Sequence, residues 1–288
     1  MNKLGPVPVG NSNPVRVMGI LNLSQESFYK KSIKITKEEI SETVKEMEYE
    51  GADFIDVGGM STAPYHFTNI SEKIEAKRIT DGLKIIQNKT NLPISVDTCR
   101  ATVAAQALEF GAEIINDISG LKYDKKMIDV VRIYDPSLVL CAFSKKIVTR
   151  NQIAKTRELL KHSINLAKSA RISTAKIVLD PAIGFFRKSG KGSFFTKINS
   201  NWIQRDLSLL SNLKSIRHEQ PILVSVSNKS FIGKIMNKKN PLDRLSGSLA
   251  SEVVAVINGA DIIRTHNVRE TLDIIRTIKK LSHLDKSL

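Results

Sequence analysis

Polar and charged side chains stand at the ends of most predicted strands of this 288-residue chain. Carboxyl or amide groups end three of these strands at Asp97, Asn116 and Asp180, and Lys229 follows another. Converging carboxylates and amides suit a flat heterocycle rich in N–H donors, and an ammonium group suits a ring carbonyl. These four residues therefore predict a site for a nitrogen heterocycle.

A second set of residues has anion-binding chemistry. Arg264 and His266 end the last predicted strand, Asn22 ends the first, and Thr62 lies in the loop after the second. Arginine offers a planar fork that matches phosphate, and an amide oxygen can ligate a divalent metal. The two sets together predict a nitrogen heterocycle bound beside a phosphate group.

The hydrophobic pattern supplies a scaffold that brings strand ends together. Short apolar runs predict eight strands, at residues 15–21, 53–57, 94–97, 113–116, 137–141, 176–180, 222–225 and 261–265. Most of these runs are continuous rather than alternating, as is typical of parallel strands buried on both faces. Amphipathic stretches between them predict eight helices, at residues 36–50, 71–88, 101–110, 125–133, 151–170, 201–217, 241–258 and 268–281.

This alternation predicts an α/β fold of the TIM (β/α)8 barrel type, which keeps active sites at the carboxyl ends of its strands. The sequence Gly-Ala-Asp or Gly-Ala-Glu joins a predicted helix to the next strand three times. Its glycines are Gly51, Gly111 and Gly259. Glycine favours the left-handed position that ends a helix, so the repeat indicates a repeated unit. An open doubly wound sheet would normally carry GxGxxG after its first strand, and residues 22–28 contain none.

Length and composition fit one such domain. Hydrophobic residues make up 41% and charged residues 25% of the chain, which excludes wholesale disorder. We expect residues 1–14 to form an N-terminal arm and residues 15–288 a single barrel domain. No stretch approaches 18 apolar residues, so no membrane span is expected. Cys99 and Cys141 lack CxxC spacing, and the default compartment is therefore a reducing cytoplasm.

The formal net charge is +15, which invites a nucleic-acid hypothesis. Residues 145–171 carry eight basic groups and one acid, and residues 186–205 carry five basic groups and no acid. The basic stretch 145–171 contains no nucleic-acid-binding motif, and few aromatic residues interleave with it. We therefore expect an anionic small-molecule ligand rather than nucleic acid; the basic helical stretch 145–171 has no assigned role.

The strand-end segments resemble those of dihydropteroate synthases, within the wider family of pterin-binding enzymes. The matching segments are collinear: MGILN at 18–22, DVGG at 56–59, ST at 61–62, ISVDT at 94–98, IINDISG at 114–120, LDP at 179–181, IGF at 183–185, SFIG at 230–233 and RTH at 264–266. The resemblance implies a TIM barrel, a homodimer, and condensation of a dihydropterin hydroxymethyl diphosphate with para-aminobenzoate, with release of pyrophosphate.

The resemblance also implies roles for individual residues. Asp97, Asn116, Asp180 and Lys229 would hold the pterin, and Asn22, Thr62, Arg264 and His266 the diphosphate, with Mg²⁺ beside Asn22. Among these, Asp97, Lys229, Arg264 and His266 would be catalytic. Phe28, Pro64, Phe186 and Ser227 would surround the arylamine.

The departures from the family pattern lie in the loops. Met60, Ala63 and Tyr65 stand in a loop that usually reads Glu-Ser-Thr-Arg-Pro-Gly, and Asn228 replaces the arginine of Ser-Arg-Lys. Three interpretations are open: an ordinary synthase, a synthase with another arylamine, or a pterin-binding protein that is either non-catalytic or passes a methyl group to a corrinoid protein. The retained RTH segment favours a diphosphate ligand.

The basic run 187–191 lies after the sixth predicted strand, at the rim of the barrel. One hypothesis makes it a solvated loop. The other makes it the receptor for the phosphate of a ribofuranosylaminobenzene phosphate, the arylamine of tetrahydromethanopterin biosynthesis.

Overall fold

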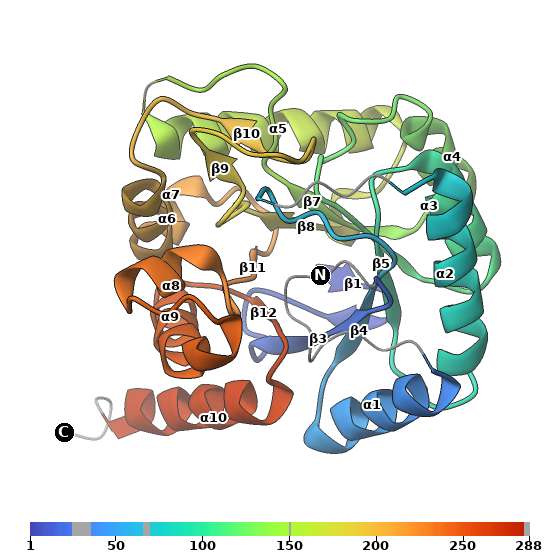
Figure 1. Ribbon diagram of the computed structural model, residues 1–288, viewed down its shortest axis with the longest axis horizontal. Coiled ribbons are helices and arrows are strands. Elements are labelled where there is room, and N and C mark those ends of the chain that lie inside the picture. The colour runs from blue at the N-terminus through green and yellow to red at the C-terminus, as the bar shows by residue number, and fades with distance from the viewer. Residues whose placement is uncertain (25–35, 66–69, 150, 285–288) are drawn as a thin grey trace.

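The computed structural model describes residues 1–24, 36–65, 70–149 and 151–284. Eight parallel strands form one sheet in the order β11-β12-β3-β4-β5-β6-β7-β8 (Figure 1). A bridge between Leu179 and Ile222 joins β8 to β11 and closes the sheet. The predicted TIM barrel is confirmed. The strands are β3 (Arg16–Asn22), β4 (Phe54–Gly58), β5 (Ile94–Asp97), β6 (Ile114–Asp117), β7 (Ser137–Cys141), β8 (Ile177–Asp180), β11 (Leu223–Val224) and β12 (Ile262–Thr265).

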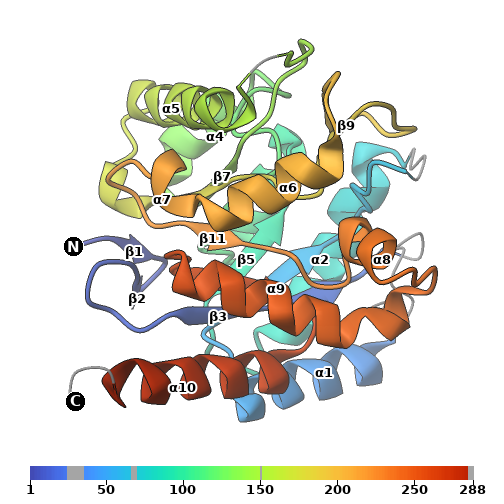
Figure 2. The same ribbon diagram turned by 90° about the vertical axis from the view of Figure 1, so that its left-hand side faces the viewer.

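Helices cover the outside of the barrel (Figures 1 and 2). They are α1 (Lys37–Glu50), α2 (Glu72–Ile86), α3 (Ala101–Glu109), α4 (Met127–Tyr134), α5 (Gln152–Ser169), α6 (Trp202–Ser211), α7 (Leu213–Ile216), α8 (Ser230–Ile235), α9 (Leu245–Ile257) and α10 (Val268–Leu284). Thr36 and Glu39 form the capping box that starts α1. Gly51, Gly111 and Gly259 all have positive φ, as the repeated junction predicts. Among the described residues, no helix is long and apolar enough to span a membrane.

The N-terminal arm is not irregular. Its strands β1 (Lys3–Leu4) and β2 (Val7–Pro8) form an antiparallel hairpin, and the Gly5 N–H donates to Ser137 Oγ at 2.9 Å. Leu4 and Val9 are fully buried against Met18, Phe54 and other apolar residues from the amino ends of the barrel strands. The hairpin therefore fills the end of the barrel opposite the predicted site.

Four further features differ from the sequence prediction. The predicted helix 201–217 is divided into α6 and α7 at Asn212. A 3-10 helix, η3 (Pro241–Arg244), precedes α9, and α8 was not predicted. The loop after β8 contains two short paired strands, β9 (Phe186–Arg187) and β10 (Thr196–Lys197). This loop therefore contains regular structure, and it lies beside the carboxyl end of the barrel.

Candidate active site

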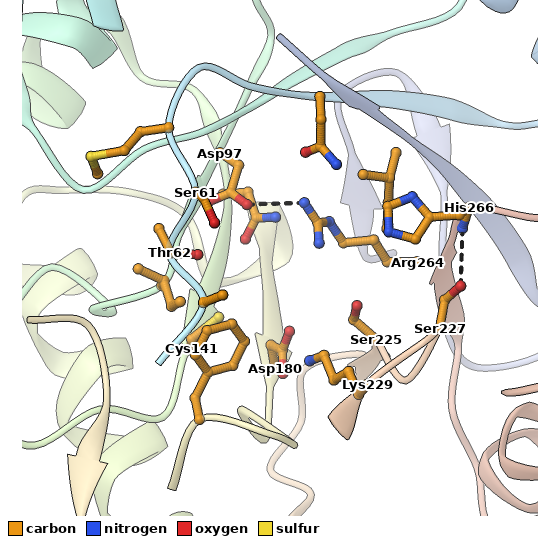
Figure 3. A pocket seen from close by; sticks show the side chains of 17 residues that line it. Ser61, Thr62, Asp97, Cys141, Asp180, Ser225, Ser227, Lys229, Arg264 and His266 are labelled. Carbon is orange, nitrogen blue, oxygen red and sulfur yellow. Dashed lines mark hydrogen bonds and ion pairs between the residues drawn. The ribbon is translucent and has the colours of Figure 1, made fainter. Parts of the chain in front are cut away.

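One pocket at the carboxyl ends of the strands gathers nine of the twelve predicted site residues (Figure 3). These are Asn22, Thr62, Asp97, Asn116, Asp180, Ser227, Lys229, Arg264 and His266. They come from the ends of β3, β5, β6, β8 and β12 and from the loops after β4 and β11, so the barrel alone explains why they meet. Met60, Ala63 and Cys141 also line the pocket; two of these, Met60 and Ala63, are among the departures from the family pattern.

Asp56 organises the floor of this pocket. Its side chain is fully buried in the middle of β4. It accepts hydrogen bonds from Ser95 Oγ at 2.5 Å, Asn116 Nδ2 at 3.1 Å and Arg264 Nε at 2.6 Å. Because Asn116 donates its amide N–H to Asp56, its carbonyl oxygen is left to accept from a ligand. Asp56 was not predicted as a site residue, although its place near the end of the predicted strand 53–57 was a signal.

Arg264 lies between two carboxylates. Its Nη2 atom is 2.9 Å from Asp97 Oδ2 (Figure 3). Its guanidinium also pairs with Asp56. Burial raises the pKa of Asp97 to about 7, and Asp56 adds to this effect while Arg264 opposes it. Asp97 therefore titrates near neutral pH, and the arginine favours its charged form.

Lys229 faces Asp180 on the other side of the pocket (Figure 3). Its Nζ donates to the Ile183 carbonyl at 2.5 Å and lies 4.7 Å from the centre of the Phe185 ring. Burial lowers the pKa of Lys229 to about 8, although Asp180 opposes this. Burial likewise raises the pKa of Asp180, which accepts a hydrogen bond from the Ala182 N–H at 2.7 Å. The pair can offer an acceptor and a donor to one ligand.

His266 is a neutral imidazole in this pocket. Burial lowers its pKa to about 3, and the nearby charges of Arg264 and Lys229 add to that effect. Its backbone N–H donates to Ser227 Oγ at 3.3 Å. His266 can therefore act toward an anion as a hydrogen-bond donor but does not add positive charge at neutral pH.

Two residues predicted around the arylamine, Pro64 and Phe186, do not line the pocket. A third, Phe28, lies outside the described residues. Phe186 is fully buried, and the Arg205 guanidinium stacks 3.7 Å from the centre of the Phe186 ring. The neighbouring Phe185 lines the pocket instead. Pro64 is buried and uses its carbonyl to accept from the Lys191 N–H at 2.8 Å, which joins two rim loops.

The basic run after β8 is only partly solvated. Residues 188–191 are exposed, but Arg187 is 6% exposed. Its guanidinium stacks 3.5 Å from the centre of the Trp202 ring and donates to Ser230 Oγ at 2.6 Å. The hypothesis of a fully solvated loop is thus wrong at Arg187, because Trp202 at the start of α6 provides an aromatic face for it.

A buried acid lies behind the strand that carries Arg264 and His266. Glu252, on α9, is fully buried. Thr271 Oγ1 donates to Glu252 Oε2 at 2.8 Å and lies 3.1 Å from Thr265 Oγ1. Burial raises the pKa of Glu252 from 4.5 to about 7. This network holds Thr265, the middle residue of the RTH segment, and none of its three residues lines the pocket.

Glu252 should make the stability of the protein depend on pH. A folded-state pKa above the unfolded value means that its stabilising contribution is complete below about pH 4.5 and is lost as pH rises through 7. Glu252→Gln stays neutral, so we expect it to gain about 3 kcal/mol relative to wild type between pH 4.5 and 8. Urea unfolding at several pH values measures this difference. Glu42→Gln, on the exposed face of α1, is the control, and equal pH profiles for Glu252→Gln and wild type would contradict the assignment.

The fold and the pocket define a parallel (β/α)8-barrel enzyme whose site joins heterocycle-binding acceptors to anion-binding donors. The family model for pterin binding enzymes matches residues 18–266. Dihydropteroate synthase of Clostridium beijerinckii is 35% identical over 271 residues, covering 93% of this chain and 94% of that protein.

Two solved structures agree. Dihydropteroate synthase of Clostridium difficile, determined in the presence of pteroic acid, superposes with a TM-score of 0.82 at 30% identity, covering 98% of this chain and 99% of that one. The Xanthomonas albilineans enzyme with 4-aminobenzoic acid gives a TM-score of 0.81 at 28% identity, covering 94% of each chain. This chain belongs to the pterin-binding enzyme family, as a transferase of the dihydropteroate synthase type.

Proposed function

We propose that this enzyme condenses a dihydropterin hydroxymethyl diphosphate with para-aminobenzoate and releases pyrophosphate. The observation that carries the proposal is the single pocket in which Asp97, Asn116, Asp180 and Lys229 face Arg264 and His266. The pteroic acid and 4-aminobenzoic acid named for the two similar structures support the choice of substrates.

The pterin would lie on the acceptor side of the pocket. One carboxylate oxygen of Asp97 accepts a hydrogen bond from Arg264, and the other can accept one from a pterin N–H. Asn116 offers its carbonyl oxygen because Asp56 holds its amide N–H, and Asp180 adds a further acceptor. Lys229 can donate to the ring carbonyl. These directional contacts fix the ring and therefore the position of its exocyclic methylene.

The reaction would then proceed by loss of the leaving group. The bond from the methylene carbon to the diphosphate oxygen breaks, the diphosphate takes the electron pair, and a cationic methylene remains. Arg264 and the neutral His266, with Thr62, can stabilise the departing charge, while nearby carboxylates stabilise the cation. The arylamine nitrogen attacks the methylene carbon and later loses a proton. No covalent bond to the enzyme is needed.

The pocket fits Mg²⁺ only together with its substrate. Among the described residues, no group of three His, Cys, Asp or Glu side chains could hold a metal. Asn22 supplies one amide oxygen at the rim, and Mg²⁺ commonly takes one or two protein oxygens plus substrate phosphates. The three carboxyl groups of Asp56, Asp97 and Asp180 also outnumber the two cationic side chains, Arg264 and Lys229, which favours an added cation. When bound, Mg²⁺ would supply positive charge to the leaving diphosphate, with Asn22 holding it.

The choice of arylamine has a direct test. Arg187 is engaged with Trp202 and Ser230, so the basic run has less free charge for a phosphate than its sequence suggests. We expect pyrophosphate release with para-aminobenzoate to exceed that with a ribofuranosylaminobenzene phosphate by about tenfold or more in kcat/KM. A preference for the phosphorylated amine would overturn this choice. Release with neither amine would favour the corrinoid methyl-transfer or non-catalytic alternative.

We also propose that two copies associate through α9. Val254 and Ile257 lie three residues apart on its outer face and are 39% and 62% exposed, and α10 runs beside α9 (Figure 2). Such exposed apolar side chains on one face suit an isologous interface. Sedimentation should show a dimer for wild type and a monomer for Ile257→Lys; a monomeric wild type would contradict the proposal.

The two cysteines are free, buried thiols, which supports a cytoplasmic location.

A further inference from the structure

The chain turns sharply after β11, just before Lys229 enters the active-site pocket. Asn228 lies in the left-handed region with a φ of 56°, which asparagine tolerates better than most other residues. Asn228 is 2% exposed and does not line the pocket, whereas Ser227 and Lys229 on either side of it do. The direction of Lys229 therefore depends on how the backbone of Asn228 is held.

Both backbone polar groups of Asn228 bond to buried side chains from η3 and α9. The Asn228 N–H donates to Ser248 Oγ at 2.9 Å, and the Asn228 carbonyl accepts from Arg244 Nη1 at 2.9 Å. Ser248 Oγ in turn donates to the Arg244 carbonyl at 2.8 Å. Neither Arg244 nor Ser248 lines the pocket. These two residues hold the Asn228 turn from outside the site.

The contacts of Arg244 suit the holding of backbone rather than the pairing of charge. Its Nε donates to the Lys238 carbonyl at 3.1 Å, and its Nη2 donates to the Lys239 carbonyl at 2.6 Å. All three guanidinium nitrogens therefore donate to backbone carbonyls. Gly233 on α8 leaves room for this side chain, since a Cβ atom there would lie 2.5 Å from Arg244 Nε.

Lys229 fits closely into the place that the turn gives it. Its Nζ donates to the Ile183 carbonyl and points toward Asp180 (Figure 3). Its Cδ atom would lie 2.8 Å from a Cβ atom on Gly184, so its stem runs directly over the backbone of the loop after β8. A rotation of the Asn228 peptide would move the ammonium group off this path, and a misplacement of about 1 Å can cost about 10²-fold in rate.

We propose that Arg244, with Ser248, is a positioning residue that fixes the Asn228 turn and thereby aims the Lys229 ammonium group at Asp180 and at the bound heterocycle. The role of the heterocycle rests on the proposed function, but the direction of Lys229 does not. Arg244 itself touches no reacting atom. A merely structural Arg244 would contribute to stability and leave the environment of Lys229 unchanged.

The test measures the pKa of Lys229 from the pH dependence of its acetylation by acetic anhydride, followed by peptide mass spectrometry. Burial lowers this pKa to about 8 in wild type. In Arg244→Met the ammonium group loses its buried place, so the pKa should rise by about one unit or more. The kcat for pyrophosphate release should fall by about 10–100-fold. The descending limb of its pH profile should move upward with the pKa.

Two further variants separate the loss of the turn from the loss of a charge. The groups that act most strongly on the charge of Lys229 are Asp180, Arg264, Asp206 and Cys141. Gly233→Ala keeps every charge but displaces the guanidinium, and Ser248→Ala removes only the bond to the Asn228 N–H side of the turn. Both should raise the pKa of Lys229, Ser248→Ala by less. They also carry the test if Arg244→Met does not fold.

Arg217→Met is the matched control for the loss of a structural arginine. Arg217 pairs with Asp261 at 2.7 Å and donates to the Gly259 carbonyl, just before β12 begins. Its loss should lower the urea midpoint and leave the pKa of Lys229 at the wild-type value. Ser251→Ala matches Ser248→Ala, because Ser251 Oγ donates to the Gly247 carbonyl of its own helix, and it should behave as wild type.

An Arg244→Met protein that lost stability as Arg217→Met does, but kept the wild-type pKa of Lys229, would overturn the proposal. So would a rise in Arg244→Met with no change in Gly233→Ala and Ser248→Ala, since that would be a charge effect only. The acetylation needs no substrate. A wild-type protein that released no pyrophosphate would therefore contradict the proposed function, while the measured pKa of Lys229 would still decide the role of Arg244.

Discussion

Arg264→Ala should slow pyrophosphate release by about 10²–10³-fold and also destabilise the fold. The rate falls because the variant lacks the cation placed to stabilise the leaving diphosphate. Stability falls because Asp56 and Asp97, which the guanidinium pairs at 2.6 and 2.9 Å, would lose their shared partner. Removing one member of a buried ion pair typically costs about 3–5 kcal/mol. Pyrophosphate release and urea unfolding measure the two effects.

Arg264→Lys separates charge from geometry. A lysine keeps the positive charge, but a single ammonium cannot bridge two carboxylates as the planar fork does. We expect it to recover part of the lost stability and little of the rate. The pKa of Asp97 should rise further in Arg264→Ala, because the arginine is the group that lowers it. An Arg264→Ala protein with wild-type unfolding free energy would show that the two ion pairs add no net stability.

The barrel was predictable because its strands are buried on both faces. Runs such as residues 138–141 and 177–179 are apolar throughout, and the helix-ending glycines repeat. The N-terminal hairpin was not predictable, since its strands are two residues long and have no periodicity. Its position depends on Leu4 and Val9 finding the open end of a barrel that only the whole chain creates.

The residues of the pocket were predictable from the topology, because the carboxyl ends of parallel barrel strands all lie at one rim. The partners of those residues were not. Asp56 holds Arg264 and Asn116 through side-chain directions that spacing does not encode. Phe185 lines the pocket instead of the predicted Phe186, because neighbouring residues in an extended segment point to opposite sides. Loop geometry settles which one faces the ligand.

Asp97→Asn should reduce kcat/KM by about 10²–10⁴-fold while the fold persists. Asparagine keeps the shape of the side chain but loses the negative charge that pairs with Arg264 and that would accept a pterin N–H and stabilise the cationic methylene. Because the pKa of Asp97 is about 7 and that of Lys229 about 8, wild-type kcat/KM should rise with pH through 7 and fall above 8. The rate of pyrophosphate release across pH 5–10 measures both limbs.

In Asp97→Asn the ascending limb should move away from pH 7, since the titrating carboxyl is gone, whereas the descending limb set by Lys229 should remain. Asp81→Asn makes the same chemical change on the exposed side of α2, where Asp81 pairs with Lys77, and should behave as wild type. An Asp97→Asn enzyme that kept the limb near pH 7 would assign that titration to another group. In that case the pair of Asp97 with Arg264 would serve the structure of the pocket rather than the binding of the pterin.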